Sequence, residues 1–377
     1  MSESLSTRIL FVTNVDWFFI SHRLVIAEEA KREGFEVIVA AEDTGRSHEI
    51  VDRGIEFINL SFSRSGTNVL KEIFTLIKFI RIYYEIRPDI VHHVTMKPVI
   101  YGSIAAKFMR VKNVINAVSG LGYAFTDGRN SLISKLMLFF LKYGFNNDAF
   151  IIFQNIDDFK EMSNLNVLST RNKIYFIKGS GVNLKEFYPT PLPKTDIIRI
   201  VLPARMLWDK GIGEFHAAAM LLKSLYFNKI QFLLVGRVDV DNKSGIPKNV
   251  LQQWADGDYF KWVGHQEDIF NVYKNSHVVV LPSYREGMPK SLIEACAMGR
   301  AIITTEAIGC RDCVDGGING LKVPIKDPQS LADAIEFLVK NPDRIIQMGI
   351  ASRLKAENEF SIVSVINTHL EIYKKCE

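Results

Sequence analysis

Cysteine is scarce in this chain of 377 residues, which has four, Cys296, Cys310, Cys313 and Cys376. So few thiols do not suit a disulfide-built secreted scaffold. The first residues show no basic region followed by an apolar stretch, so we expect a reducing, cytoplasmic setting. Cys310 and Cys313 have the spacing of metal or redox sites, but no second Cys/His pair accompanies them. We therefore interpret them as unpaired packing thiols.

Long hydrophobic runs are also missing, since none reaches the roughly 18 residues that span a bilayer. The nearest is SLISKLMLFFLKYGF, residues 131–145. Its polar stripe is limited to Ser131, Ser134, Lys135 and Lys142. Two interpretations stay open: a buried core helix, or a helix in the membrane interface with its lysines toward lipid phosphates.

Charge of one sign is not in excess either. The 46 Lys and Arg against 42 Asp and Glu give a formal net charge of +4. This balance is too mild to indicate nucleic-acid binding, but it tolerates an anionic ligand or an anionic membrane surface. Low-complexity tracts and short-period repeats are absent. The length suits two domains of about 150 to 200 residues.

Strand-like apolar runs alternate with amphipathic helical stretches along the chain, which predicts parallel sheets covered by helices. The expected strands are 8–13, 36–41, 89–94, 113–118, 149–154, 173–178, 198–204, 231–236, 259–264, 277–283 and 300–306. Pro189, Pro191 and Pro193 interrupt the pattern. We therefore predict two doubly wound α/β domains, 1–180 and 197–377, joined by a linker at 181–196. We expect the last helix to pack back on the first domain, and ligands to bind in the cleft between the domains.

The stretch YREGMPKSLIEACAMGR, residues 284–300, follows a predicted buried strand and places two carboxylates eight positions apart. Pro289 suits the first helical position, and Gly299 suits the end of the helix. The unpaired N–H groups at such a helix start form an anion site fit for a diphosphate. Glu294 then lies about 7.5 Å along the axis, within reach of a ribose diol. Glu286 precedes the helix and faces the other end of the same ligand.

A second stretch, LPARMLWDKGIGEF, residues 202–215, places Arg205 and Lys210 between a strand and a helix that opens near Gly211. Arginine offers phosphate a planar fork and lysine a compact charge. Two cations at this point can neutralise a diphosphate leaving group as its bond breaks. Each of the two stretches could be an ordinary solvated turn, but together they supply the two halves of one diphosphate site.

These two stretches resemble the donor site of glycosyltransferase family 4, with its Glu-x7-Glu motif. The resemblance extends to GSGVNLKEFYP, QFLLVGRVD and GCRDCVDGGINGLKVP. YGSIAAKFMRVKNVINAVSGLGYAF and ARMLWDKG are most similar to a bacterial subgroup of N-acetylgalactosaminyl transferases acting on polyprenyl-diphosphate-linked sugars. The resemblance implies the GT-B fold, two Rossmann-like domains facing across a cleft, and a reaction that retains the donor's α configuration.

Residue roles follow from this resemblance position by position. Glu294 would hold the ribose, and Glu286 would contact the donor sugar and stabilise it as the bond to diphosphate breaks. Gly236 and His265 would lie near the phosphates and base. The remaining donor-binding positions would be Arg205, Lys210, Gly287, Met288, Pro289, Lys290 and Ser291.

The first half departs from the family pattern at two points. TNVDWFFISHR stands where many members have a glycine pair, and Ser119-Gly120 stands where many have His-Gly beside the donor sugar. This half normally binds the acceptor. Strand-end positions make Lys97 and Asp16 our catalytic candidates there. The acceptor-side candidates are His22, Arg23, His93, Ser119 and Gly120, although a strand-end histidine such as His93 is more often structural.

Asp239-Val240-Asp241 has the Asp-x-Asp form that holds a divalent metal in other transferases. It lies in a polar loop, and Arg205 and Lys210 already supply positive charge. We therefore expect no metal site and no cofactor, only the nucleotide sugar as substrate.

The sequence thus predicts a glycosyltransferase that moves an N-acetylhexosamine from a UDP-sugar to a lipid-linked saccharide in surface polysaccharide assembly. We expect it to be cytoplasmic and peripheral on the inner face of the membrane, without nucleic-acid partners. One alternative is an enzyme of similar fold resembling UDP-N-acetylglucosamine 2-epimerase, but no separate acid/base set is evident. Another is a nucleotide-binding module without catalysis, which the intact carboxylate pair and both cations disfavour.

Overall fold

The computed structural model describes residues 6–62, 69–121, 132–145, 148–240, 242 and 244–377, without the side chains of 69–71 and 132–137. The chain divides into two compact units, residues 1–180 with 363–377, and residues 181–362. The proline-marked segment belongs to the second unit. There the buried Arg300 guanidinium donates to the backbone oxygen of Thr190 at 2.9 Å.

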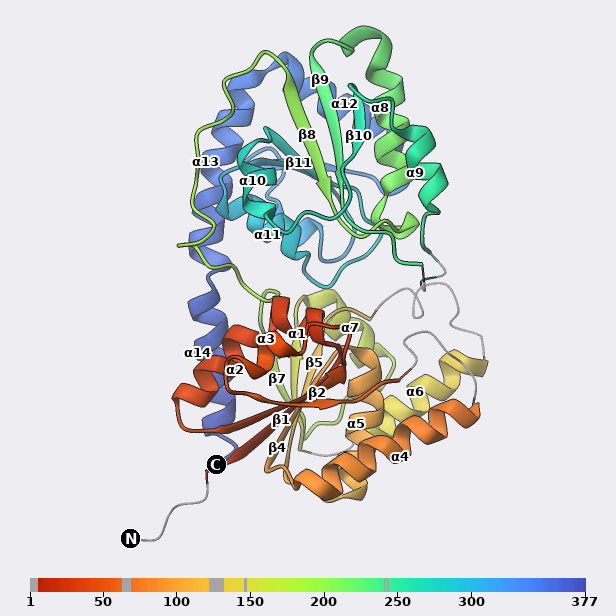
Figure 1. Cartoon of the computed structure of the whole chain (residues 1–377), viewed down its shortest axis with the longest axis vertical. Coiled ribbons are helices and arrows are strands. Elements are labelled where there is room, and N and C mark those ends of the chain that lie inside the picture. The colour runs from red at the N-terminus through yellow and green to blue at the C-terminus, as the bar shows by residue number, and fades with distance from the viewer. Residues whose placement is uncertain (1–5, 63–68, 122–131, 146–147, 241, 243) are drawn as a thin grey trace. The chain divides into compact units, whose positions relative to one another are not determined.

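The first unit is built on a seven-stranded parallel sheet in the order β3-β2-β1-β4-β5-β6-β7 (Figure 1). The strand order reverses between β1 and β4, the point at which open α/β sheets place their ligand crevice. The strands are β1 Arg8–Val15, β2 Glu36–Glu42, β3 Glu56–Asn59, β4 Ile90–Val94, β5 Asn113–Val118, β6 Phe150–Phe153 and β7 Lys173–Phe176.

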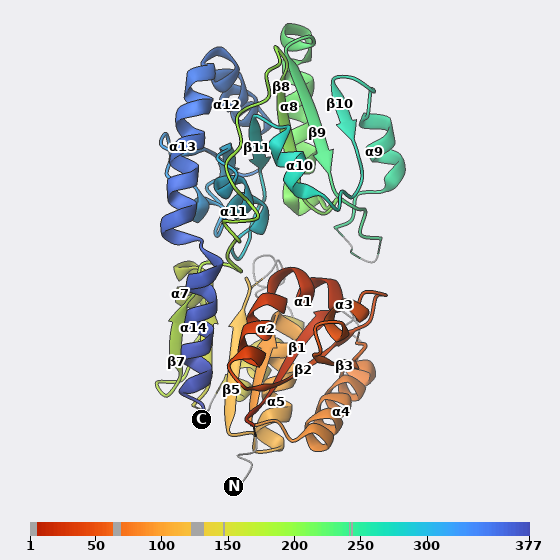
Figure 2. The ribbon, with the colours of Figure 1, turned by 60° about the vertical axis from the view of Figure 1, so that its left-hand side comes forward.

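Helices connect these strands, as parallel pairing requires. They are α1 Asp16–His22, α2 Leu24–Arg32, α3 His48–Val51, α4 Val69–Ile86, α5 Met96–Phe108, α6 Leu132–Phe145 and α7 Ile156–Asn164. The C-terminal helix α14, Ile362–Lys374, also packs in this unit, where the Tyr373 hydroxyl and His92 Nδ1 are 2.8 Å apart. Figure 2 draws α14 in front of β7, and just after α14 Lys375 Nζ lies 3.2 Å from the hydroxyl of Tyr175 in β7. Within the described part of the chain, no helix is long and apolar enough to cross a bilayer.

The second unit has a six-stranded parallel sheet in the order β10-β9-β8-β11-β12-β13. Its strands are β8 Ile198–Pro203, β9 Ile230–Val235, β10 Phe260–Trp262, β11 Val278–Leu281, β12 Ala301–Thr305 and β13 Gly320–Val323. Its helices are α8 Ile212–Tyr226, α9 Lys248–Trp254, α10 Ile269–Lys274, α11 Lys290–Ala297, α12 Pro328–Lys340 and α13 Pro342–Glu359, with short 3₁₀ turns η2 Trp208–Lys210 and η3 Arg311–Cys313. The two-domain parallel α/β prediction is confirmed.

All the strands expected from the sequence are present, but two others were missed. Both β3 and β13 are four-residue edge strands. Their sequences, EFIN and GLKV, lack a long apolar run because an edge strand is only partly covered. Short, half-exposed strands carry too little pattern to be recognised without their neighbours.

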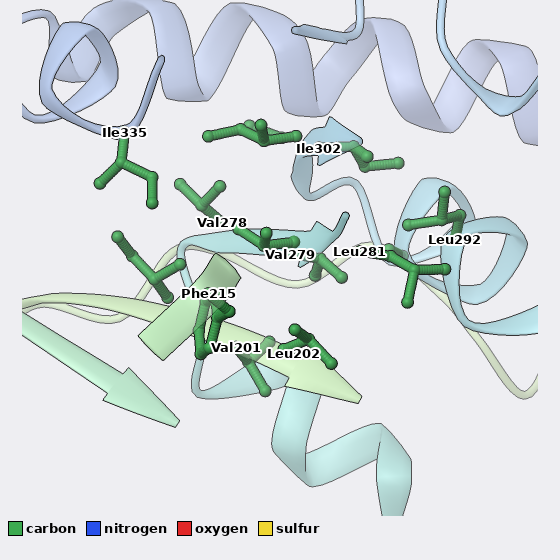
Figure 3. Close-up of a cluster of buried hydrophobic side chains, with 14 of the residues drawn as sticks. Val201, Leu202, Phe215, Val278, Val279, Leu281, Leu292, Ile302 and Ile335 are labelled. Atoms are coloured by element: carbon green, nitrogen blue, oxygen red, sulfur yellow. The ribbon is translucent and has the colours of Figure 1, made fainter. Parts of the chain in front are cut away.

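Central strands of the second sheet carry almost unbroken β-branched and leucine runs because helices cover both of its faces. Val201, Val279 and Ile302 are fully buried among Phe215 of α8 and Leu292 of α11 (Figure 3). Each such side chain contributes about 1.5 to 3 kcal/mol when removed from water. This core fixes the strand ends from which the candidate site is built.

Gly211 lies between η2 and α8 in the left-handed region, with φ of 72°. A Cβ atom built there would lie 2.0 Å from the backbone oxygen of Pro282. The loop after β8 can therefore approach the loop after β11 only because position 211 has no side chain.

We expect Gly211→Ala to destabilise the protein more than Gly257→Ala. Gly257 has a similar φ of 90°, but no atom lies within 4 Å of the point that a Cβ would occupy, so it reports the backbone cost alone. That cost is roughly 1 kcal/mol, and the clash at Gly211 adds to it. Chemical denaturation of both variants measures the difference. Equal losses would contradict the close approach.

Candidate functional site

The candidate site lies at the carboxyl edge of the second sheet, where the loops after β8 and β11 meet. These two strands pair directly in the sheet. The Tyr284 N–H donates to the backbone oxygen of Asp209 at 2.9 Å, and the Ser283 hydroxyl donates to the same oxygen at 3.1 Å. Residues far apart in the sequence are thereby held side by side.

Lys210 and Glu286 form an ion pair across these loops. Their side chains are only 16% and 15% exposed, and the Ser283 hydroxyl donates to the same carboxylate oxygen at 2.8 Å. The sequence placed Lys210 on the phosphates and Glu286 on the sugar as separate groups. The structure joins them, and neither the pair nor the contribution of Ser283 was predicted.

The helix expected after Glu286 is present as α11, Lys290–Ala297. Pro289 is its N-cap, with φ of −72° and ψ of 117°, and not its first helical residue as predicted. An extended residue before the first turn leaves the backbone donors of that turn outside the helix ladder. Pro289 itself makes no side-chain cap hydrogen bond to them. Gly299 follows the helix with φ of 65°, which confirms the predicted end.

Glu294 is 7% exposed on α11, so its carboxylate is largely removed from solvent. The Tyr273 hydroxyl donates to its Oε2 at 3.1 Å, and Lys290 Nζ lies 3.4 Å from its Oε1. Burial raises the pKa of Glu294, while Lys290 and Tyr273 act in the opposite direction. Its burial distinguishes Glu294 from an ordinary surface acid.

Arg205 follows β8 and is 41% exposed, with its guanidinium 2.9 Å from the carboxylate of Asp239. Asp239, the first carboxylate of the Asp-x-Asp sequence, is therefore paired with an arginine. Asp241, the second, lies outside the described residues. The described residues also contain no group of three or more His, Cys, Asp or Glu side chains arranged to hold a metal ion.

Gly236 directly follows β9, and His265 lies in the loop after β10, at the same edge of the sheet. The Gly236 N–H donates to the backbone oxygen of Gly264 at 2.8 Å. A Cβ at position 236 would lie 1.7 Å from the backbone oxygen of Ala204, so Gly236 is required where β9 passes β8. His265 is exposed. Packing therefore explains Gly236 without a ligand.

Cys313 packs against the loop that contains Gly287 and Met288. Cys313 Sγ lies 3.3 Å from the sulfur of Met288, and all four cysteines of the chain are free and buried. Burial raises the pKa of Cys310 to about 12, so this thiol stays protonated and unreactive. Their interpretation as packing thiols is confirmed.

Comparisons with known proteins agree with this geometry. A glycosyl transferase 4-like family model matches residues 8–155, and a glycosyl transferases group 1 model matches residues 198–341. The chain belongs to the family 4 glycosyltransferases. The loops after β8 and β11 and the whole of α11 fall within the second match.

Curated relatives of this glycosyltransferase are themselves transferases. The N,N'-diacetylbacillosaminyl-diphospho-undecaprenol alpha-1,3-N-acetylgalactosaminyltransferase of Campylobacter jejuni is 29% identical, covering 89% of this chain and 90% of its own. The UDP-Gal:alpha-D-GlcNAc-diphosphoundecaprenol alpha-1,3-galactosyltransferase of Escherichia coli is 24% identical, covering 90% and 89%.

Solved structures share the fold of this glycosyltransferase. A glycosyltransferase of Rickettsia africae superposes with a TM-score of 0.73 at 21% identity, covering 98% of both chains. Anabaena HepE, solved with UDP and glucose, gives 0.77 at 15% identity, covering 98% of this chain and 99% of its own. The fold is therefore GT-B.

The first unit of the glycosyltransferase corrects the assignment of Asp16. Its side chain is fully buried, and its oxygens accept from the backbone N–H groups of Trp17, Thr44 and Arg46 at 2.6, 2.7 and 2.9 Å. These bonds order the loop after β2. A carboxylate with no exposed surface and this many donors is structural, so the catalytic prediction for Asp16 is wrong.

His93 is also a core residue and not an acceptor contact. Its ring is fully buried, with Nε2 at 2.6 Å from the Tyr83 hydroxyl and Nδ1 at 2.7 Å from Asn116 Oδ1. Burial lowers the pKa of His93 to about 4, so the ring is neutral at physiological pH. Of the two alternatives that the sequence left open, the structure supports the structural one.

Arg23, predicted as an acceptor-side residue, is only 3% exposed. Burial lowers the pKa of Arg23 to about 10. Lys97 lies half-buried, 2.8 Å from Glu72, so part of its charge is neutralised within the unit. His22 stacks on a phenylalanine with ring centroids 4.1 Å apart.

Ser119 and Gly120 follow β5 at the carboxyl edge of the first sheet, as predicted. Gly120 has φ of 101°, a conformation that favours glycine. Ser119 is partly buried, and its hydroxyl has no hydrogen-bond partner among the described residues. Ser119 thus still offers a polar side chain, and Gly120 still allows the backbone to approach a ligand closely.

Proposed function

We propose that the enzyme transfers an N-acetylhexosamine from a UDP-sugar to a lipid-linked saccharide in surface polysaccharide assembly, with retention of the donor's α configuration. The observation that carries the proposal is the Lys210–Glu286 pair beside the start of α11. The names of the Campylobacter and Escherichia relatives support the type of acceptor. Epimerisation of a UDP-sugar is not favoured, because these relatives transfer sugars.

The proposed donor pose follows from the charges. The diphosphate would take backbone N–H groups between Gly287 and Ser291, apart from Pro289, which has none. It would also take the guanidinium of Arg205, in competition with Asp239. Lys210 would contact a diphosphate oxygen while still facing Glu286. As the bond from the sugar carbon to the phosphate oxygen breaks, negative charge grows on the diphosphate, where Lys210 stabilises it.

Glu286 would stabilise the opposite charge in the same step. The sugar ring becomes electron-poor as the leaving group departs, and a carboxylate next to it lowers the energy of that state. The Ser283 hydroxyl keeps the carboxylate in place. Glu294 would bind the ribose diol and contribute to affinity alone.

Glu286→Gln should lower kcat by roughly 100-fold or more, with a small change in UDP affinity. Glu294→Ala should weaken UDP binding by roughly tenfold or more, because hydrogen bonds to a charged group contribute about 1.5 to 3 kcal/mol. Steady-state kinetics and calorimetric titration with UDP separate the two effects. Glu306→Gln, a half-exposed carboxylate after β12, is the control. Wild-type rates and affinities in both variants would contradict the donor-site proposal.

We also propose that the reaction needs no divalent metal. Arg205 and Lys210 supply the positive charge that a metal would bring to the diphosphate, and Asp239 is held by Arg205. Enzyme stripped of metal should keep full activity in excess chelator. Loss of activity that magnesium or manganese restores would contradict this.

A third part of the proposal is peripheral contact with anionic lipid through the first unit. Helices α4 and α6 both contact α5, and Figure 1 draws the three together. Apolar side chains are exposed on α4 and α6, namely Ile73 at 51%, Phe74 at 64%, Ile77 at 53% and Phe139 at 63%. Lys78, Arg81 and Lys142 are exposed among them. This combination suits an anionic membrane surface.

The described part of 131–145 bears on the two earlier interpretations of that segment. Leu141 and Phe145 are buried in the unit, whereas Phe139 and Tyr143 are exposed. Ser131 and the side chains of Ser134 and Lys135 lie outside the described residues. The helix thus has a core face and also exposed apolar positions. We propose that these positions and those of α4 belong to one lipid-facing surface.

Phe74→Glu with Phe139→Glu should reduce co-sedimentation with phosphatidylglycerol-rich vesicles several-fold, because each places a charge in the lipid-facing surface. Leu225→Glu on α8 is the matched control, since Leu225 is 71% exposed in the other unit. Binding that is unchanged in the double variant, or reduced equally by the control, would contradict this surface.

A further inference from the structure

Tyr273 lies in α10 and is fully buried. Its backbone oxygen accepts a 2.9 Å hydrogen bond from Nε of Arg300, which fixes the end of the helix. Its hydroxyl lies 3.1 Å from Oε2 of Glu294 and 3.0 Å from the backbone oxygen of Ser291. Both acceptors belong to α11, so one phenol contacts the helix at two points.

A phenol has one proton, and both of its neighbours here are acceptors. Burial raises the pKa of Tyr273 well above its usual value, so the hydroxyl is a permanent donor at physiological pH. The single proton is shared between Oε2 of Glu294 and the backbone oxygen of Ser291. Lys290 lies near Oε1, so the carboxylate is contacted at both of its oxygens. Its remaining lone pairs are directed by these two contacts.

We propose that Tyr273 is a positioning residue for nucleotide recognition, whose hydroxyl orients the Glu294 carboxylate to receive the ribose. This inference rests on the proposed function, in which Glu294 binds the ribose diol. The structure shows why such help is needed. A carboxylate that is 7% exposed has little water to hold it in its charged form, and only the charged form accepts both ribose hydroxyls.

Tyr273 therefore also affects the pH range of binding. Lys290 on α11 and Tyr273 on α10 are the charged or titratable groups whose contacts lower the pKa of Glu294, against the burial that raises it. Removing the Tyr273 hydroxyl deprives the charged carboxylate of Glu294 of a hydrogen-bond donor, so the pKa of Glu294 rises further. Protonation then begins at a higher pH, and UDP binding is lost at a higher pH than in the wild type.

The test is calorimetric titration of the full chain with UDP between about pH 5 and pH 8. Tyr273→Phe should weaken UDP binding by about five- to tenfold near neutral pH and shift the acid loss of affinity to higher pH. Tyr259→Phe is the matched control, because Tyr259 is a buried phenol of the same unit whose hydroxyl donates to the backbone oxygen of Ala219 at 2.9 Å. It should leave affinity and pH profile unchanged.

Glu294→Gln separates this inference from the function on which it rests. In that background Tyr273→Phe should have little further effect on UDP affinity, since its target carboxylate is gone. Unchanged UDP binding in Glu294→Gln itself would overturn the ribose assignment and this inference with it. Glu294→Gln could weaken UDP binding while Tyr273→Phe keeps the wild-type affinity and pH profile. That result would overturn only the role of Tyr273. An equal loss from Tyr273→Phe in both backgrounds would show a merely structural role and overturn it too.

Discussion

The ion pair between Lys210 and Glu286 is the interaction on which the candidate site depends. It joins the loops that follow β8 and β11, two strands that pair directly in the second sheet. Both charges are largely removed from solvent, so neither could be left alone without a large cost. A diphosphate at this edge would enter an arrangement in which cation and carboxylate are already in place.

Backbone features of the same loops make this approach possible. Gly211 brings the β8 loop within contact distance of Pro282. Gly309 lies against the backbone of Glu286 and Gly287, where a Cβ would come within 2.5 Å of either oxygen. Cys313 packs against Met288, with their sulfur atoms 3.3 Å apart. The polar edge is thus supported by close glycine contacts and by apolar packing beneath it.

The sequence predicted most of this edge because its signals are local. A buried strand, a turn with proline and a short helix follow one another within residues 277–299, so Glu286 and Glu294 could be placed on a helix start directly. The pairing of Lys210 with Glu286 could not be predicted, because it depends on β8 lying next to β11. Nothing in the sequence marked Tyr273 as a functional residue, since a tyrosine in an amphipathic helix is usually a core residue.

The first unit was harder to predict for a related reason. Asp16 and His93 both follow or end strands, as functional residues often do, but three-dimensional burial decided their roles. Backbone donors from a loop 28 to 30 residues away surround Asp16. A buried tyrosine and asparagine enclose His93. Position along the chain cannot distinguish a polar group facing a ligand from one satisfied inside the unit.

The central claim is that the carboxyl edge of the second sheet binds the nucleotide diphosphate of the donor. A crystal structure of the enzyme with UDP tests it most directly. The claim predicts phosphate oxygens at Lys210, Arg205 and the first turn of α11, with the ribose on Glu294. A nucleotide bound elsewhere, or one bound here with Glu294 and Lys210 out of contact, would contradict it.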